Sequence, residues 1–297
     1  MSDCLQTFLF DSADVRGAVV NLDATWREVL TRRAYPGPVQ SLLGEAMAAA
    51  ALLSSSIKFE GALVLQTQAT AADAPVRLMV VECNADLAMR ATAKLGTLPS
   101  AVAGHTLAGM IGDGKIAITL DPGNGQAAYQ GVVPIEGALL GAALETYMER
   151  SEQIETRIYL AADEQRAAGL LIQRIPQDGG HPRAVASCWE DATVLAHTIT
   201  APELLTLAPR EVIRRLFHEF DLRLFDERRP YFRCTCSKTR VADMLRMLGR
   251  EEVDSILAEQ GQVSVDCEFC NRHYGFDAID AAQVFLPLPA AASGARH

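Results

Sequence analysis

The first 175 residues contain short apolar stretches and amphipathic or Ala-rich stretches in irregular order. Helices are predicted at Asp23–Arg33, where Asp23 could cap the first turn, at Pro38–Ser56 and from Gly137 to about Glu152. Runs rich in Val, Ile and Leu predict strands at Val15–Asn21, Ala62–Gln68, Val76–Glu82, Lys115–Leu120, Tyr129–Ile135 and Arg157–Ala161. Because strands and helices do not alternate regularly, we expect a mixed sheet with packed helices and not a doubly wound parallel fold.

The apolar pattern changes after a polar, breaker-rich run at Gln177–Pro182, which marks a boundary. Two helices are predicted beyond it, at Cys188–Thr200 and Pro209–Phe220. The second helix has one apolar face, formed by Val212, Ile213, Leu216, Phe217 and Phe220. Two more helices, near Ser237–Leu248 and Glu251–Gln260, and then two short strands complete the pattern.

These boundaries predict an α+β protein in several parts. Residues 1–177 form the α/β core domain, residues 178–231 a helical linker region, and residues 232–286 a small C-terminal domain. Residues 287–297 are expected to be a disordered tail. Asp121–Gly125 is a strong turn signal, so Lys115–Ile135 is expected to be a hairpin.

Composition narrows the class of protein. The chain has 297 residues, of which 49% are hydrophobic and 22% charged, as in an ordinary globular protein. Its longest apolar run is Ala46–Leu53, far short of the roughly 20 residues that a membrane-spanning helix needs, so no such helix is expected. The start lacks a basic segment before an apolar one, so a secretory signal is not expected and a cytoplasmic location is predicted.

The strongest chemical signal is a pair of cysteine motifs, Cys234-Thr235-Cys236 and Cys267-Glu268-Phe269-Cys270. Four thiolates suit a tetrahedral metal, and in an intracellular chain the usual ion is zinc, one per chain. Cys234 and Cys236 can chelate together because residues i and i+2 of a strand face the same side. A site closed by four protein ligands favours a structural or redox role over hydrolysis, and no catalytic residue is predicted. The alternative is that the four motif cysteines are unrelated core residues that bind no metal. Such a packing role is what we expect for the three remaining cysteines, Cys4, Cys83 and Cys188.

A redox role is chemically reasonable for this site. Metal-bound sulfurs stay thiolate, Arg233, Lys238 and Arg272 favour the anion further, and thiolates are what oxidants attack. Oxidation to disulfides would expel the metal and remove its support from the C-terminal domain. The neighbouring helix Pro209–Phe220 would then lose a packing partner and expose apolar surface. An inert structural site beside an ordinary core helix remains the alternative.

At these motifs the sequence resembles the redox-regulated chaperones of the heat-shock protein family of about 33 kDa. The resemblance is carried by Tyr231–Ser237, Cys267–Cys270, Tyr274–Asp277, Tyr129–Val133, Arg150–Gln153 and Arg215–Glu219. It implies a cytoplasmic protein that is not an enzyme and that acts in protein folding during heat shock and oxidative stress. It spans nearly the whole chain, with no departure at the four cysteines.

The resemblance implies a specific mechanism. In the reduced state zinc on Cys234, Cys236, Cys267 and Cys270 keeps the protein inactive. Oxidants would form the disulfides Cys234–Cys236 and Cys267–Cys270 and release zinc, so that residues 232–286 act as a redox-switch domain. That domain and the linker of residues 178–231 would unfold, and the protein would dimerise. It would bind unfolding clients without ATP and later pass them to ATP-dependent foldases. The apolar face of Pro209–Phe220 is the candidate client-binding surface.

Three other motifs partly match known enzyme or nucleotide-binding sites but lack residues that those sites require. Gly109–Lys115 fits the start of a phosphate loop, but Ile116 occupies the position of the magnesium-binding Ser or Thr, so we expect a turn before a strand. None of the six histidines is followed two residues later by Glu, as a zinc deaminase requires. His218-Glu219 lacks the second histidine of a metalloprotease helix, and His218 is expected at the surface.

A zinc-ribbon nucleic-acid-binding module is the competing class. The net charge is −10, which disfavours nucleic acid in general. However, residues 226–250 contain seven basic residues against three acidic ones. Such a module would bind nucleic acid with a steep salt dependence in either redox state, whereas the chaperone would act only after oxidation.

Overall fold

The computed structural model describes residues 2–11, 13–56, 61–97, 106–175 and 186–286. The chain forms two compact units, Met1–Arg233 and Cys234–His297. Helices α5 to α7, which fall in the predicted linker region, belong to the first unit. The division into core, linker and switch domain therefore remains a functional prediction, and the expected tail lies outside the described residues.

The first unit contains a five-stranded antiparallel sheet, which we call sheet A. Its order is β10-β1-β2-β9-β8. The strands are β1 (Cys4–Phe10), β2 (Val15–Leu22), β8 (Thr156–Ala162), β9 (Ala167–Arg174) and β10 (Leu222–Leu224). Strand β9 is buried along nearly its whole length, because helices cover both faces of the sheet.

A second sheet of six strands, sheet B, has the order β11-β5-β4-β3-β6-β7. Its strands are β3 (Ala62–Ala69), β4 (Val76–Asn84), β5 (Ala88–Leu95), β6 (Gly114–Asp121), β7 (Tyr129–Pro134) and β11 (Tyr231–Phe232). Because β11 pairs with β5 in parallel and the other pairs are antiparallel, sheet B is mixed, although its parallel strand comes from residues 231–232 and not from the predicted core domain. Strands β6 and β7 confirm the predicted hairpin.

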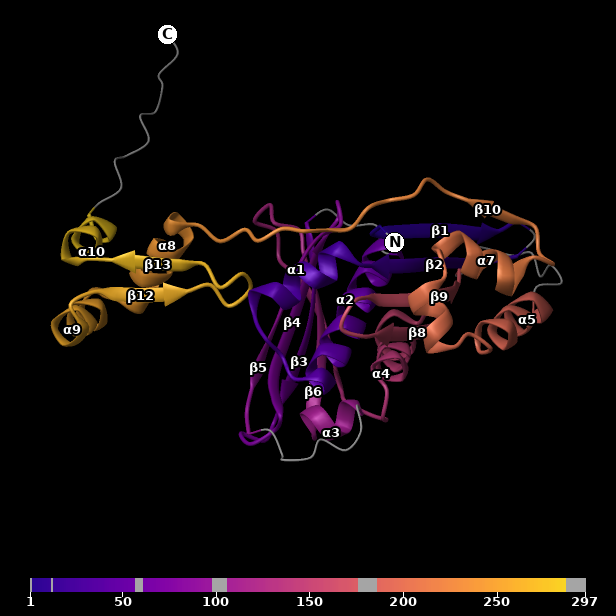
Figure 1. Cartoon of the computed structure of the whole chain (residues 1–297), viewed down its shortest axis with the longest axis horizontal. Helices are drawn as coiled ribbons and strands as arrows, with labels where there is room; N and C mark the ends of the chain where they lie inside the picture. Colours follow the sequence, from indigo (N-terminus) through magenta and orange to yellow (C-terminus); the bar gives the residue numbers. More distant parts are fainter. Residues whose placement is uncertain (1, 12, 57–60, 98–105, 176–185, 287–297) are drawn as a thin grey trace, which may run out of the picture. The chain divides into compact units, whose positions relative to one another are not determined.

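Helix α2 (Gly37–Ser56) is the central packing element of the first unit. It contacts β2, β8 and β9 of sheet A and β3, β4 and β5 of sheet B, and Figure 1 shows it among these strands. Its sequence is apolar nearly all round, which is typical of a helix buried on every side. Gly44 allows close approach, since a Cβ there would lie 2.5 Å from the Cβ of Ala162.

Three helices cover the other face of sheet A, namely α5 (Ala186–Ala196), α6 (Ala201–Thr206) and α7 (Pro209–Phe217). The apolar face of α7 packs in the same cluster as Phe8 and Phe10 of β1. The Phe217 ring lies 5.6 Å from that of Phe8 and 5.3 Å from that of Phe10, distances typical of favourable aromatic pairs. The face predicted from sequence periodicity is therefore a buried interface in this conformation.

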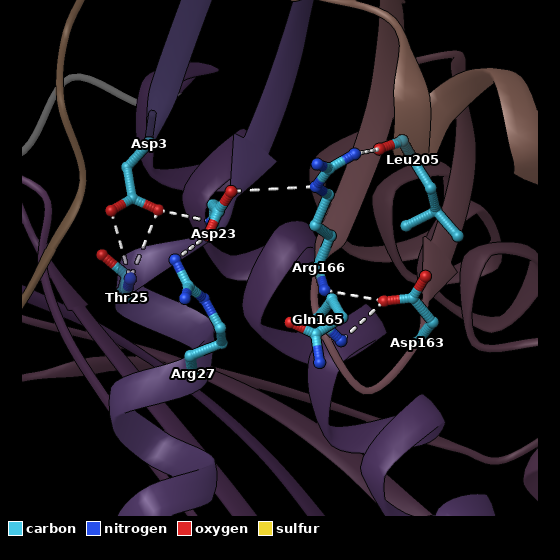
Figure 2. A network of polar contacts seen from close by, with 8 residues as sticks. All are labelled: Asp3, Asp23, Thr25, Arg27, Asp163, Gln165, Arg166 and Leu205. Atoms are coloured by element: carbon cyan, nitrogen blue, oxygen red, sulfur yellow. Dashed lines mark hydrogen bonds and ion pairs between the residues drawn. The ribbon is translucent and has the colours of Figure 1, made fainter. Parts of the chain in front are cut away.

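The start of α1 (Ala24–Arg32) differs from the prediction. Asp23 occupies the capping position, but its side chain does not cap the helix. Instead the Asp3 carboxylate accepts hydrogen bonds from the backbone N–H groups of Asp23, at 2.6 Å, and Thr25, at 3.1 Å (Figure 2). Asp23 is thereby free to pair with Arg27 and Arg166. The cap comes from a residue 20 positions upstream, which local sequence cannot indicate.

Arg166, in the turn between β8 and β9, ties α6 to this network (Figure 2). Its Nη1 donates to the Leu205 carbonyl at 2.9 Å, and its Nε lies 3.7 Å from the Asp23 carboxylate. The turn itself is shaped by Asp163, whose Oδ1 accepts from the backbone N–H groups of Gln165 and Arg166, both at 2.7 Å. Arg166 thus holds the helical layer against the core.

The predicted helix from Gly137 to Glu152 is shorter and changes type. It consists of α4 (Leu140–Tyr147) followed by a π-helical turn, η1 (Met148–Glu152). The stretch resembling a phosphate loop, Gly109–Lys115, begins in a short helix, α3 (Leu107–Ile111), and ends in β6, which starts at Gly114. The expected strand therefore follows, but only residues 112–113 form the turn before it.

The second unit consists of α8 (Lys238–Leu248), α9 (Arg250–Gln260), the antiparallel pair β12 (Val263–Asp266) and β13 (His273–Phe276), and α10 (Ala278–Val284). Its described buried apolar core is small. The core residues are Leu245, Val253, Val263, Tyr274, Phe276, Ala281 and Val284. The α+β class with a small C-terminal cysteine unit is confirmed.

Replacing Arg166 with Ala is expected to loosen the helical layer. Loss of the charged hydrogen bond to Leu205 should speed amide exchange in α6 and α7 by an amount equivalent to about 1–2 kcal/mol. Arg174→Ala is the matched control, because Arg174 makes an exposed pair with Glu155 that should contribute less than about 0.5 kcal/mol. Unchanged exchange in α6 and α7 of the Arg166 variant would contradict its role.

Glu45 on α2 gives a pH prediction. Burial raises the pKa of its carboxyl from 4.5 to about 7. The folded state therefore retains a proton between these values that the unfolded chain releases, so Glu45 costs stability progressively from pH 4.5 to 7. We expect Glu45→Gln to raise the free energy of unfolding by roughly 1–3 kcal/mol at pH 8 and by much less at pH 5.

Urea unfolding followed by tryptophan fluorescence measures this effect in the first unit, because both tryptophans, Trp26 and Trp189, lie there. Exposed Glu164→Gln provides the control for the loss of one negative charge. An equal gain at pH 5 and pH 8 for the Glu45 variant would show that burial of its charge is not the cause.

Candidate metal centre

The four motif cysteines come together within the second unit. Cys234 and Cys236 lie in the extended segment that leads into α8, where the Ser237 side chain caps the helix by accepting from the N–H of Arg240. Cys267 and Cys270 lie in the turn between β12 and β13. In that turn the Cys267 carbonyl accepts from the Asn271 N–H at 2.8 Å, and Asn271 adopts a left-handed conformation that Asn tolerates well.

The four sulfurs form one cluster. All lie within 4.8 Å of one another, with Sγ–Sγ distances of 3.7 Å from Cys234 to Cys267 and 3.3 Å from Cys236 to Cys270. A tetrahedral zinc ion with bonds of about 2.3 Å places its sulfur ligands about 3.8 Å apart. The donor set and its spacing therefore fit a closed tetrathiolate site, and the cluster can hold a metal ion.

The thiols differ in their tendency to ionise. Burial raises the pKa of Cys236, but hydrogen bonds from Tyr274 and the neighbouring thiols outweigh this and lower its pKa to about 7. Burial and hydrogen bonds to the neighbouring thiols raise the pKa of Cys270, which is the buried member of the cluster. The cluster therefore contains one sulfur that is readily anionic and can start metal binding, while metal must displace protons from others.

Tyr274 is the supporting residue to which sequence reasoning assigned no role. Its hydroxyl donates to Cys236 Sγ at 3.1 Å, and strand β13 holds it there. Beside the site, the paired residues Asp266 of β12 and His273 of β13 also contact each other through their side chains, with His273 Nδ1 2.8 Å from Asp266 Oδ1. Tyr274 was visible as a motif residue, but its hydrogen bond depends on the fold of the turn.

Among the three basic residues expected to favour thiolates, the structure places Arg272 in the field of Cys236 and Cys270. Lys238 instead pairs with the Asp280 carboxylate at 3.0 Å and lies over the Phe276 ring. Arg233 belongs to the first unit, where its N–H donates to the Met89 carbonyl, so its effect on the thiols remains a prediction.

The candidate client-binding residues lie in the first unit, away from solvent. Val212, Ile213, Leu216 and Phe217 are at most 5% exposed, and Phe220 is partly buried. Their role in binding thus requires that α7 leave sheet A. His218 is exposed, as expected, and Cys83 is fully buried, as a packing residue should be. Cys4 and Cys188 are partly buried and lie outside the metal cluster.

Comparison with known proteins places this geometry in context. The family described as "Hsp33 protein" matches residues 3–277. The 33 kDa chaperonin of Chromobacterium violaceum is 45% identical over 99% of this chain and 98% of its own. That of Nitrosococcus oceani is 44% identical over 99% of both chains. The crystal structure of the 33 kDa chaperonin, a heat shock protein 33 homolog, from Thermotoga maritima has a TM-score of 0.80 at 20% identity. It covers 95% of this chain and 97% of its own and shows the same fold.

None of the helices within the described ranges is both long and apolar enough to cross a bilayer.

Replacing Cys267 and Cys270 with Ser is expected to abolish tight binding of added Zn²⁺ and to loosen the second unit without oxidant. A tetrathiolate zinc site contributes of the order of 10 kcal/mol to folding, and the small core of this unit leaves little to replace it. Metal content and amide exchange in α8 to α10 measure both effects. Cys188→Ser is the control and should bind like the unchanged chain. A second unit that stays protected in the double variant would contradict the supporting role of the metal.

Proposed function

Because the chain belongs to the Hsp33 family, we propose that it is a redox-regulated, ATP-independent holdase chaperone of the cytoplasm. The activity is binding of unfolding proteins to prevent their aggregation, without catalysis. The single observation that carries the proposal is the cluster of four sulfurs in a unit with a very small core. A change in the chemistry of those sulfurs is therefore a change in the stability of that unit.

In the reduced state Cys234, Cys236, Cys267 and Cys270 would hold one Zn²⁺ ion. Binding to it would keep the sulfurs as thiolates and would cross-link the segment before α8 to the turn between β12 and β13. Tyr274 supports this arrangement by donating a hydrogen bond to Cys236. The second unit stays folded, and the apolar face of α7 stays packed on sheet A.

Oxidation reverses this state. Each of the disulfides Cys234–Cys236 and Cys267–Cys270 forms when two thiolates give two electrons to an oxidant such as hydrogen peroxide, which takes up two protons from the solvent and is reduced to two molecules of water. Sulfurs joined in disulfides are poor metal ligands, so zinc is released and the second unit loses its main support. The cluster brings the four sulfurs within 4.8 Å, so modest rearrangement suffices to join them.

Loss of the second unit is proposed to propagate to the linker region of residues 178–231. Its described part includes α5 to α7, whose release would expose Val212, Ile213, Leu216, Phe217 and Phe220 together with the face of sheet A that they cover. That apolar surface would bind clients and favour a dimer of the oxidised protein. Reduction would restore the thiols, and clients would pass to ATP-dependent foldases.

The basic window of residues 226–250 offers little support for a zinc-ribbon nucleic-acid-binding module. Several of its charged groups are engaged within the protein: Arg228 donates to the Ala85 carbonyl, Arg240 to Thr235 Oγ1 and Arg246 to the Val284 carbonyl. Because these guanidinium groups already donate hydrogen bonds within the protein, they do not form a row of basic side chains available to contact the phosphates of a nucleic acid.

One series of measurements tests the proposal on the full-length, zinc-loaded chain before and after oxidant. We expect zinc release, seen with a chromogenic chelator, and suppression of light scattering by a thermally unfolded client to appear together after oxidation. Cys188→Ser should behave like the unchanged chain. If the oxidised, zinc-free protein leaves client aggregation unchanged, the proposed holdase function is refuted. Salt-sensitive nucleic-acid binding in both redox states would favour the alternative.

A further inference from the structure

The first unit contains a pocket of about 650 Å³, which lies apart from the cysteine cluster. Residues of α2, α4 and β8 border it, together with residues of α5 and α6 from the helical layer. Its apolar lining includes Ile158, Leu160, Ile199 and Leu204. A pocket of this size is in the range of small-molecule sites. Because α5 and α6 form part of its wall, the pocket exists only while these helices are packed on sheet A.

Glu45 of α2 is the acidic residue of the lining that has no partner. Its carboxylate makes no hydrogen bond or ion pair with any residue that the structure describes. The other acidic residue, Glu145, is engaged, since it accepts from the Ile158 N–H at 2.8 Å and lies 3.9 Å from Arg157. An unpaired carboxylate that is partly withdrawn from water costs free energy when it ionises, so a positive charge bound beside Glu45 would stabilise the first unit.

The rest of the pocket determines what else a ligand must carry. Beside the apolar lining, the rim residues Leu139 and Val194 are 65% and 67% exposed. A ligand that fits both features has a positive charge for Glu45 and an apolar body for the walls. A primary amine on an aliphatic chain is the simplest small molecule of this kind, and the net charge of −10 also favours a cation.

The walls of the pocket also determine which state of the protein a ligand binds. Under the proposed function, an unfolding client is bound only after the helical layer has left sheet A, when this pocket no longer exists. A ligand of the pocket therefore binds the closed, zinc-loaded state and is not a client. A molecule that binds the closed state and not the open one makes opening less favourable by mass action.

We propose that this pocket binds a small organic cation, an aliphatic primary amine, which pairs with Glu45 and holds α5 and α6 on sheet A. The bound amine opposes release of the helical layer and so restrains the chaperone after zinc has left. This consequence for activation rests on the proposed function. Binding itself, and its effect on the helical layer, are properties of the reduced protein and are tested without oxidant.

Four small molecules test the recognition by isothermal titration calorimetry on the reduced, zinc-loaded protein at pH 8. Hexylamine is the probe and should bind, whereas hexanoate, which has the opposite charge, should not. 1-Hexanol lacks the charge and methylamine lacks most of the hydrocarbon chain. Each should therefore bind at least about tenfold more weakly than hexylamine.

Variants locate the site. Glu45→Gln should weaken binding of hexylamine about tenfold. Because this variant is expected to be more stable than the unchanged chain at pH 8, a loss of binding cannot come from unfolding. Exposed Glu164→Gln, which removes the same charge elsewhere, should leave the affinity unchanged. At the exposed rim, Val194→Lys should weaken binding, and Val194→Glu should retain or strengthen it.

The pH dependence of hexylamine binding gives a further readout. Glu145, Arg157, Tyr159 and His197 also line the pocket, so the unchanged chain is compared with Glu45→Gln at each pH. Burial raises the pKa of Glu45 to about 7, so its carboxylate is largely charged at pH 8 and largely protonated at pH 6. The affinity difference between the two proteins should therefore be large at pH 8 and small at pH 6.

Amide exchange measures whether the bound amine holds the helical layer. At a free hexylamine concentration ten times its Kd, exchange of the amides of α5 and α6 through opening of the layer should slow about tenfold. Exchange in α8 to α10, which belong to the second unit, should be unchanged. Glu45→Gln at the same amine concentration should show little slowing.

The consequence for activation is measured with hydrogen peroxide as the oxidant. Hexylamine should delay the suppression of client aggregation by the unchanged chain and not by Glu45→Gln, while zinc release keeps its rate. A chain that never protects clients after oxidation, with or without hexylamine, would refute the proposed holdase function, whereas calorimetry and exchange on the reduced protein decide separately whether the amine binds and holds the layer.

Equal affinity of the unchanged chain and Glu45→Gln for hexylamine would overturn the proposal, as would equal binding of hexylamine and 1-hexanol. Unchanged exchange in α5 and α6 at saturating hexylamine would also overturn it, because the bound amine would then not depend on the helical layer.

Discussion

A unit as small as Cys234–His297 buries too little apolar surface to fold firmly by hydrophobic packing alone, and this constraint governs the rest of the molecule. A metal ion held by the four sulfurs, as proposed, would be the cross-link that compensates, because the sulfurs come from the segment before α8 and from the turn between β12 and β13. Their chemistry is set by a few neighbours, above all Tyr274 on Cys236. Stability and thiol reactivity therefore depend on the same atoms.

The first unit, in contrast, is stabilised by a large apolar core. Helix α2 is buried by both sheets, and sheet A is covered on its other face by α5, α6 and α7. Polar contacts also attach the helical layer to the rest of the unit, among them the hydrogen bond from Arg166 to the Leu205 carbonyl. The apolar face of α7 thus belongs to a core cluster separate from the one around α2 at the centre of the unit.

The sequence was most informative where local pattern and structure coincide. Strands rich in Val and Ile, the helix Pro38–Ser56 and the amphipathic face of α7 were found close to their observed bounds. Strands β1, β5, β9, β10 and β11 were not identified. Ala and Gly dominate parts of β5 and β9, while β10 and β11 are only three and two residues long, and packing makes them strands. A Cβ at Gly169 of β9 would lie 2.8 Å from Leu52 Cδ1 of α2. Cysteine spacing predicted which four residues form the cluster, whereas the Asp3 cap, the Tyr274 hydrogen bond and the pocket at Glu45 depend on contacts between distant segments.

The segment that connects α7 to Cys234 has a further consequence for self-association. Its strand β10 pairs with the outer edge of β1, and its strand β11 pairs with the outer edge of β5, where Tyr231 donates to the Asp86 carboxylate at 2.7 Å. One short stretch of chain therefore occupies an outer edge in each of the two sheets (Figure 1). Unpaired strand edges are templates for intermolecular β-pairing. One side of each sheet therefore ends in a strand of only two or three residues, which is too short a backbone ladder for fibrils or amorphous aggregates to grow from at that edge.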